Sequence, residues 1–323
     1  MTRAFSSAVA SVLVSIAALA GCGARPFAEG GSRDLVIVTS LPADAPEVLL
    51  LRAIVQRPAI RIENEAAYAV RTAEPSDPRV YRARSLLFLG YGPREAMPKP
   101  LEPLAALLET GSTPFVFAPD VWLRGQAVGL VWTERREELM AALESRQNRL
   151  FDALDRATFA TVRARLLVLP RDGDAERRLH EETGLTLRIP RGYELRVDRA
   201  SHAALLIQEG PPTRMLRVAP APDSASPDLV AARDALARAF RPDERTLRES
   251  DPTLTSAELR GALRRMHGRW TDDAVSAAGP YRFYEVSLGP RRYWVDLAVF
   301  APGRPKLPYL RELQALAETL SSR

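Results

Sequence analysis

The sequence predicts an α+β fold, with mixed or antiparallel sheets flanked by helices, in a chain of 323 residues. Short apolar runs rich in β-branched residues predict strands, and amphipathic segments with a period near 3.6 predict helices between them. Near the C-terminus, the alternating runs 281–289 and 291–302 lie close enough to form a hairpin, which a regular parallel α/β fold lacks. The composition, 46% hydrophobic and 26% charged, is that of a globular protein.

The first 21 residues have the pattern of a secretory signal peptide. Arg3 precedes the apolar run 8–20, which is shorter than the roughly 20 apolar residues that a membrane span needs. The run ends in Leu-Ala-Gly-Cys at 19–22, the pattern called a lipobox. We therefore expect cleavage after residue 21 and a diacylglyceryl group on Cys22, because lipid transfer needs a soft nucleophile such as a thiol.

Cys22 is the only cysteine of the chain. A plain signal peptide with a chance cysteine, or a buried cysteine that packs as a small apolar residue, is the alternative interpretation. A lipidated Cys22 would make the membrane a partner and leave no thiol for a disulfide or a metal. Residues 22–33 are small, polar and glycine-rich, which predicts a flexible tether. By similarity to enterobacterial sorting, Gly23 favours the periplasmic face of the outer membrane in the cell envelope.

We divide the chain after the tether into an N-terminal half, 34–172, and a C-terminal half, 173–323. Helices of the N-terminal half are expected at 42–56, after a proline-marked start, and at 134–157, on an apolar face that includes Leu143 and Leu154. Strands are expected at 34–40, 67–73, 84–90, 126–133 and 163–169.

The C-terminal half has a similar mixture of strands and helices. Its strands are expected at 185–190, 202–209, 214–221, 281–289 and 291–302. A helix follows Pro227 with Ser226 as its cap, a second opens with the capping box 255–258 and carries Leu263 and Met266, and a third ends the chain. Both halves contain an apolar strand that runs into a long helix. This suggests two similar halves that arose by duplication, although two uses of a common motif would look the same.

The net charge of +5 does not predict a nucleic-acid partner. Lysine occurs only at Lys99 and Lys306, so nearly all the basic residues are arginines, as in proteins from GC-rich genomes. The arginines are interleaved with acids, which is typical of ion pairs on solvated helices. The surplus positive charge predicts at most a weak attraction to anionic lipid headgroups.

The sequence contains no recognisable catalytic, metal-binding or cofactor-binding motif. His180, His202 and His267 lie far apart and lack the spacing of zinc ligands on a helix. The segment 90–95, Gly-Tyr-Gly-Pro-Arg-Glu, begins like a dinucleotide-binding loop but lacks the third glycine, so we interpret it as a turn. Neither a phosphate-binding loop nor a nucleophile elbow occurs. We therefore expect no metal and no cofactor.

The segment 267–286 concentrates more functional residue types than any other. Its Gly279-Pro280 pair predicts a turn between strands, and Trp270 is expected to fill the core. The turn would carry Arg269 and Asp272 outward to a rim. The candidate binding surface consists of Arg269, Asp272, Asp273 and Tyr281. The alternative is a purely structural role for the whole segment.

The region 265–320 resembles the C-terminal part of bacterial lipoproteins grouped as domain of unknown function 4837, and the segments 185–195 and 120–132 resemble further parts of that family. Ala277-Ala278 replaces the family's Met-Gly, and Phe300 stands where Tyr is frequent. The resemblance implies a lipidated α+β protein and no assigned activity. The positions that match are Gly268, Trp270, Asp273, Gly279, Pro280, Ala301, Pro302 and Lys306.

These observations favour a membrane-anchored envelope lipoprotein that binds a partner protein or a ligand and is not an enzyme. The alternative is a hydrolase of envelope polymers that uses carboxylates dispersed along the sequence. Two carboxylates or a Ser/His pair converging in a deep cleft would favour the hydrolase, and an apolar binding surface would favour the binding protein.

Overall fold

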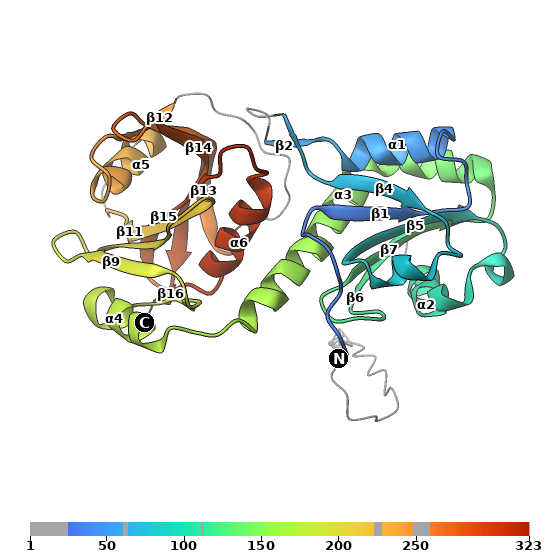
Figure 1. Cartoon of the computed structure of the whole chain (residues 1–323), viewed down its shortest axis with the longest axis horizontal. Helices are drawn as coiled ribbons and strands as arrows, with labels where there is room; N and C mark the ends of the chain where they lie inside the picture. Colours follow the sequence, from blue (N-terminus) through green and yellow to red (C-terminus); the bar gives the residue numbers. More distant parts are fainter. Residues whose placement is uncertain (1–24, 61–63, 111–112, 223–227, 248–258, 323) are drawn as a thin grey trace, which may run out of the picture.

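The computed structural model describes residues 25–60, 64–110, 113–222, 228–247 and 259–322. The protein has an α+β fold with two main sheets that lie side by side, one formed by each half of the chain (Figure 1). Parallel and antiparallel strand pairs both occur. The α+β class predicted from the sequence is therefore confirmed.

The N-terminal sheet has five strands in the order β4-β1-β5-β7-β6, and all neighbours except β6 and β7 run parallel. Parallel strands covered on both faces need apolar residues at consecutive positions, and β1 and β5 are buried over almost their whole length. Helices α1 and α3 cover one face, and α2 covers the other. The elements are β1 (Asp34–Val38), α1 (Pro46–Val55), β4 (Ala69–Ala73), β5 (Ser85–Tyr91), α2 (Glu102–Thr110), β6 (Phe115–Pro119), β7 (Ala127–Thr133) and α3 (Arg136–Leu167).

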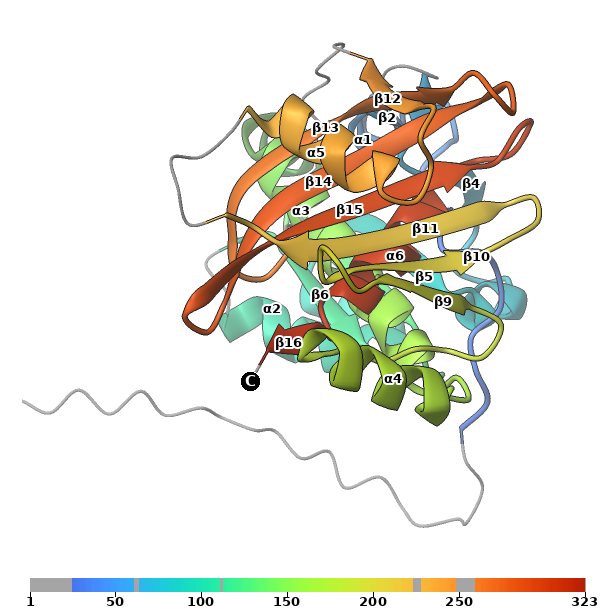
Figure 2. The same ribbon diagram turned by 90° about the vertical axis from the view of Figure 1, so that its left-hand side faces the viewer.

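The C-terminal sheet has seven antiparallel strands in the order β12-β13-β14-β15-β11-β10-β9. Helix α5 packs on one face, and α6 with α4 packs on the other (Figure 2). The elements are α4 (Gly173–Thr183), β9 (Glu194–Asp198), β10 (Ala203–Gln208), β11 (Thr213–Pro220), α5 (Leu229–Arg238), β12 (Glu244–Leu247), β13 (Ala262–Asp272), β14 (Ala277–Leu288), β15 (Arg291–Phe300) and α6 (Leu307–Ala317).

Short elements connect the main ones. Two small antiparallel strand pairs occur, one between segments adjacent in sequence and one between distant segments. Three short 3-10 helices lie in the described part of the N-terminal half. They are β2 (Pro58–Ile60) with β3 (Glu65–Ala66), β8 (Leu185–Thr186) with β16 (Ser321–Ser322), η2 (Pro78–Arg82), η3 (Arg94–Ala96) and η4 (Lys99–Leu101).

One apolar core runs through both halves where α3 packs against α6. At this contact the guanidinium of Arg311 on α6 donates to the carboxylate of Asp155 on α3, and both residues are at most 1% exposed. The hydroxyl of Tyr68 lies 3.4 Å from each of these groups. Burial alone would lower the pKa of Arg311, but Asp155 and Tyr68 outweigh it and raise that pKa. The two halves are thus joined by a paired charge inside an apolar contact.

The first turn of α6 is capped by a residue of the other half. The carboxylate of Glu65 accepts the backbone N–H groups of Lys306 at 2.7 Å and Leu307 at 3.0 Å. The residue before the helix provides no side-chain cap of its own. Because a helix N-terminus carries unpaired N–H groups and a partial positive charge, an acid placed there stabilises the helix.

Two predicted elements are wrong. Residues 163–169 were expected as a strand, but α3 continues to Leu167 because Phe159, Val162 and Leu166 keep the helical period of burial. Residues 259–266 were expected to lie on a helix, but β13 begins at Ala262, where pairing with β14 overrides the helical pattern. Asp228 caps α5. Ser226 and the capping box 255–258 lie outside the described residues.

The expectation of a flexible tether at 22–33 is corrected over its described part. Phe27 forms a β-bridge with Arg124, and Glu29 forms one with Ala83. The N–H of Ala28 donates to the carbonyl of Arg124 at 2.9 Å. Extended backbone next to unpaired strand ends can satisfy its own hydrogen bonds there, so the segment is held against the N-terminal sheet.

The two halves do not share a topology. The strand β7 runs into α3 and β15 leads to α6, as the sequence suggests, but β7 has one parallel and one antiparallel neighbour, whereas both neighbours of β15 are antiparallel. The suggestion of two similar halves is therefore corrected. A strand followed by a helix is a unit that sheets of either kind can contain.

Replacing Asp155 by Ala should lower the free energy of unfolding by about 3–5 kcal/mol, because the guanidinium of Arg311 would remain buried without its partner. Urea unfolding followed by circular dichroism measures this loss. The control is Glu194→Ala, which breaks an exposed ion pair with Arg196 and should change stability little. Equal, small effects of the two substitutions would contradict the role of the Arg311–Asp155 pair.

Candidate functional site

A cleft of about 300 Å³ lies at the carboxyl ends of β1 and β5. The chain leaves β1 towards β4 on one side, whereas β5 on the other side is followed in the sheet by β7. In open sheets of parallel strands, ligands bind where neighbouring strands send their connections in opposite directions. The cleft lies at this point, and its volume is at the lower end of the range for small-molecule sites.

Apolar side chains and three hydroxyl groups line the cleft. Thr39 and Ser40 directly follow β1, and Tyr91 ends β5. None of the residues that line the cleft carries a charged side chain. The surface therefore suits an uncharged molecule with an apolar body. The apolar side chains include Val38, Leu41, Phe88, Leu89, Leu101 and Trp132.

Trp132 forms one wall and depends on two glycines. Its indole Nε1 donates to the carbonyl of Gly92 at 2.9 Å. A Cβ atom at Gly90 would lie 2.3 Å from the indole ring, so only glycine leaves room for this ring position. Gly92 has a φ of 127°, which also favours glycine. The segment 90–95 was interpreted from the sequence as a turn, but its first two residues end β5, a bend follows at Gly92, and η3 begins at Arg94. Gly90 and Tyr91 line the cleft.

An ion pair joins the first turns of the two helices that begin near this edge of the sheet. Arg136 at the start of α3 donates two hydrogen bonds to Glu47 of α1, at 2.7 and 3.1 Å. These hydrogen bonds lower the pKa of Glu47. Glu47 is therefore ionised near neutral pH and unsuited to act as a general acid.

The cleft can bind a molecule, but its lining lacks the groups that acid–base or nucleophilic catalysis needs. The hydroxyl of Thr39 accepts the N–H of Leu41 at 3.1 Å and is engaged in the turn after β1. No carboxylate or imidazole lines the cleft to activate Ser40. Within the described ranges, no group of three or more metal-ligating side chains is assembled.

The structure separates the four residues of the candidate binding surface predicted from the sequence. Arg269 and Asp273 are exposed, and Asp273 pairs with Arg245 of β12. Asp272 and Tyr281 are only 4% and 2% exposed, which corrects their expected place on a surface. The expected turn at 279–280 lies within β14, and the hairpin turns at 273–276 instead. Because β14 begins at Ala277 rather than at 281 and pairs with β13 up to Asp272, the side chains of Asp272 and Tyr281 are buried near α5.

Trp270 is fully buried, which confirms its predicted place in the core. It lies opposite Gly279 on β14, where an added Cβ would approach the carbonyl oxygen of Val299 to 1.9 Å. The Gly279-Pro280 pair therefore serves close strand packing rather than a turn. Cys22 lies outside the described residues.

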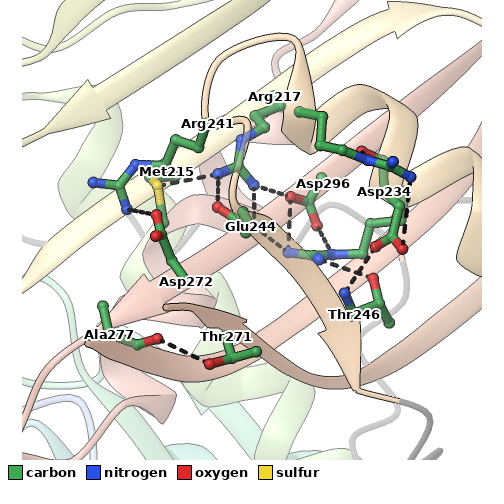
Figure 3. Close-up of polar contacts among 12 residues, drawn as sticks. Met215, Arg217, Asp234, Arg241, Glu244, Thr246, Thr271, Asp272, Ala277 and Asp296 are labelled. Carbon is green, nitrogen blue, oxygen red and sulfur yellow. Dashed lines mark hydrogen bonds and ion pairs between the residues drawn. The ribbon is translucent and has the colours of Figure 1, made fainter. Parts of the chain in front are cut away.

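A network of four charged side chains lies beneath α5 (Figure 3). Arg217 of β11 and Arg233 of α5 each contact both Glu244 of β12 and Asp296 of β15, at distances of 2.5 to 2.9 Å. All four side chains are fully buried. The guanidinium of Arg233 also lies 4.0 Å from the ring centre of Tyr281. Two positive and two negative charges thus balance inside the protein.

The charges of this network stabilise one another. Burial alone would raise the pKa of Glu244, but Arg217 and Arg233 together lower it. Burial likewise opposes the charge of Arg217, and Glu244 with Asp296 raises its pKa above the ordinary value. Because these side chains have no exposed surface, the network holds α5 to the sheet and offers no place for a ligand.

The residues of the cleft have no distinguishing signal in the sequence. Thr39, Ser40, Tyr91 and Trp132 follow or end predicted strands, and nothing in their identity distinguishes them from ordinary residues at strand ends. The signal that would have found them is the order and direction of β1 and β5. These depend on pairing between distant segments, which one sequence does not display.

No protein-family model matches the chain, and no curated protein matches it. A solved structure from Bacteroides thetaiotaomicron is 8% identical over 43% of this chain and 45% of its own, with a TM-score of 0.24. LpqN of Mycobacterium tuberculosis, described as involved in cell envelope biogenesis, is 11% identical over 42% of this chain and 82% of its own, also with a TM-score of 0.24. Likeness at this level supports no transfer of function. In the described ranges, no helix is both long and apolar enough to cross a membrane.

Replacing Trp270 by Ala should cost about 3–5 kcal/mol of stability, because it leaves a large cavity between α5 and the sheet. Thermal melts of Trp270→Ala and of the neighbouring Arg269→Ala measure the contrast. Arg269 is exposed, so its replacement should leave the melting temperature almost unchanged. An unshifted melt for Trp270→Ala would show that the indole does not support the core.

Proposed function

We propose that the protein is a lipid-anchored protein of the bacterial cell envelope whose cleft between β1 and β5 binds a small uncharged amphiphile. The observation that carries this proposal is an apolar cleft at the carboxyl edge of a parallel sheet, with hydroxyl groups and no charged side chain in its lining. The anchor is a lipid on Cys22 at the periplasmic face of the outer membrane. The lipobox and Gly23 support this location.

The lining favours a ligand with one polar end. Thr39, Ser40 and Tyr91 place hydroxyl groups near the ends of two neighbouring strands, and the remaining surface is apolar. Removing a charged group from water without a partner of opposite charge is costly, so a cleft of this kind selects against ions. A glycerol or similar polyol headgroup on a short acyl chain fits this pattern of hydroxyls and apolar walls.

The hydrolase alternative has less support from the described residues. The carboxylates of Glu244, Asp296 and Asp155 are fully or almost fully buried and paired with arginines, away from the cleft. A glycosidase or esterase needs a proton donor or a nucleophile within reach of the bound substrate. The lining of the cleft supports binding rather than cleavage.

Monohexanoylglycerol should bind to the cleft, whereas hexanoate, which has a similar chain and a negative charge, should not. Isothermal titration calorimetry measures both. Trp132→Ala removes one wall and should weaken binding of the glyceride about tenfold, as expected for a large aromatic contact. Chromatography of the same mixtures shows whether hexanoate is released, which would favour the hydrolase instead.

Two glycine substitutions separate the cleft from general effects on the fold. Gly90→Ala should displace the ring of Trp132 and reduce binding. Gly173→Ala, at the start of α4, has no atom within 4 Å of the added methyl group and should bind normally. Equal affinities of the two variants, or tighter binding of hexanoate than of the glyceride, would contradict the proposed site.

The lipid anchor is tested separately. Cys22→Ala should abolish incorporation of labelled palmitate and leave an uncleaved precursor or a secreted form, because the only thiol of the chain is lost. Metabolic labelling followed by membrane fractionation measures both effects. Palmitate incorporation that survives the substitution would show that the anchor lies elsewhere.

A further inference from the structure

We propose that the edge of the protein next to its N-terminal segment docks on an anionic phospholipid surface. We call the residues of this edge the anchor-side patch. The proposal rests on lipidation of Cys22 and deepens it, because it assigns the face that the anchored protein turns towards its membrane. The anchor-side patch consists of Phe27, Arg124, Arg165, Leu167, Val168 and Leu169.

The lipid would be attached close to this edge. Only three peptide links separate Cys22 from Arg25, the first described residue, and they span at most about 11 Å. The chain is fixed directly afterwards. Phe27 forms a β-bridge with Arg124, and the N–H of Glu29 donates to the carbonyl of Arg82 at 2.8 Å. A membrane-inserted lipid on Cys22 must therefore bring this edge near the headgroups.

The anchor-side patch exposes apolar side chains to solvent. Phe27 is 43% exposed, and three consecutive residues at the end of α3, Leu167, Val168 and Leu169, are 41%, 54% and 44% exposed. Arg188 donates to the carbonyls of Leu167 and Leu169, which fixes the backbone of this segment. Consecutive apolar residues left exposed in a fixed segment are typical of a surface that contacts a partner or a membrane.

Arginines connect the two parts of the anchor-side patch. The guanidinium of Arg124 lies 4.6 Å from the ring centre of Phe27, and that of Arg165 lies 5.9 Å from it. Arg165 is two residues before Leu167 on α3. Figures 1 and 2 both place the N-terminal segment and the connection from α3 to α4 along the lower edge of the molecule. The apolar residues and the arginines thus share one edge.

The electrostatics of this edge suit an anionic surface. In the described part of the chain, neither Arg124 nor Arg165 forms an ion pair with an acid. Asp120, near Arg124, accepts the N–H of Gly125. Burial, followed by repulsion from Arg165 and Arg311, lowers the pKa of Arg84 to about 10. A positive edge with exposed apolar groups is the combination that binds anionic lipid headgroups and the adjacent acyl region.

A single introduced thiol tests the contact in the lipidated mature protein. Leu169→Cys lies in the anchor-side patch, and the control Leu263→Cys replaces a leucine of β13 that is 57% exposed. Lipidation consumes Cys22, so each variant carries one site for an environment-sensitive fluorophore. The proteins are reconstituted in vesicles of phosphatidylcholine and phosphatidylglycerol that contain nitroxide-labelled acyl chains. The fluorophore at 169 should be strongly quenched, and the one at 263 should not.

Charge variants test the role of the arginines. Arg124→Gln with Arg165→Gln should reduce the ratio of docked to undocked protein about fivefold for each arginine, in anionic vesicles only. The matched control, Arg149→Gln with Arg291→Gln, removes two exposed arginines outside the patch and should leave quenching at 169 unchanged. High salt should have the effect of the patch variant. Thermal melts verify that both variants remain folded.

Three results would overturn the proposal. They are an attached protein without quenching at 169, equal quenching at 169 and 263, and equal loss in the two double variants. Self-association through the patch, seen as oligomers in sedimentation without quenching, would replace the membrane by a second copy as the occupant. Failure of the proteins to attach, with Cys22 itself reacting with the fluorophore, would instead refute lipidation and remove the basis of the docking proposal.

Discussion

The placement of the two sheets depends on the buried ion pair between Arg311 and Asp155. Each charge alone would be costly in the apolar contact between α3 and α6, so the two helices cannot shift without separating the pair. Glu65 adds a second constraint, because its carboxylate satisfies the first N–H groups of α6 from the opposite half. Both links join residues that are distant in sequence. They explain how a mostly parallel sheet and an antiparallel sheet share one core.

Because α6 fixes α3 in this way, α3 determines where the functional edges of the protein lie. It begins directly after β7, whose Trp132 forms a wall of the cleft, and ends at the anchor-side patch. A helix of 32 residues, with a kink at Arg146, measures about 48 Å along its path. The N-terminal segment meets the sheet beside Ala83 and Arg124, before β5 and β7, whereas the cleft follows β1 and β5. An anchored protein would therefore hold its cleft away from its own membrane contact.

The sequence predicts most individual elements, because local periodicity is sufficient for them. It does not predict the direction of β1 and β5, and therefore not the cleft between them. It also misses the buried charges. In the sequence, nothing distinguishes Arg217 and Arg233 from surface arginines. Their partners Glu244 and Asp296 lie on other strands and pair with them only in the folded protein. The sequence places Trp270 correctly in the core because so large an apolar side chain is costly to expose. The burial of Asp272 and Tyr281 depends on where β13 and β14 end and begin, which only strand pairing determines.

The apolar run 166–169 shows how a wrong prediction can carry functional information. The run suggested a strand because its residues are consecutive and apolar, yet the helical period of α3 extends through Leu166 and leaves the next three side chains in solvent. The N-terminal segment approaches this edge through Phe27, whose ring centre lies 5.9 Å from the guanidinium of Arg165, and it leaves the three side chains exposed. A conflict between apolar composition and exposure is expected where a surface has a partner. The cleft produces no such conflict, because a site for an uncharged ligand uses the same residues as an ordinary strand end.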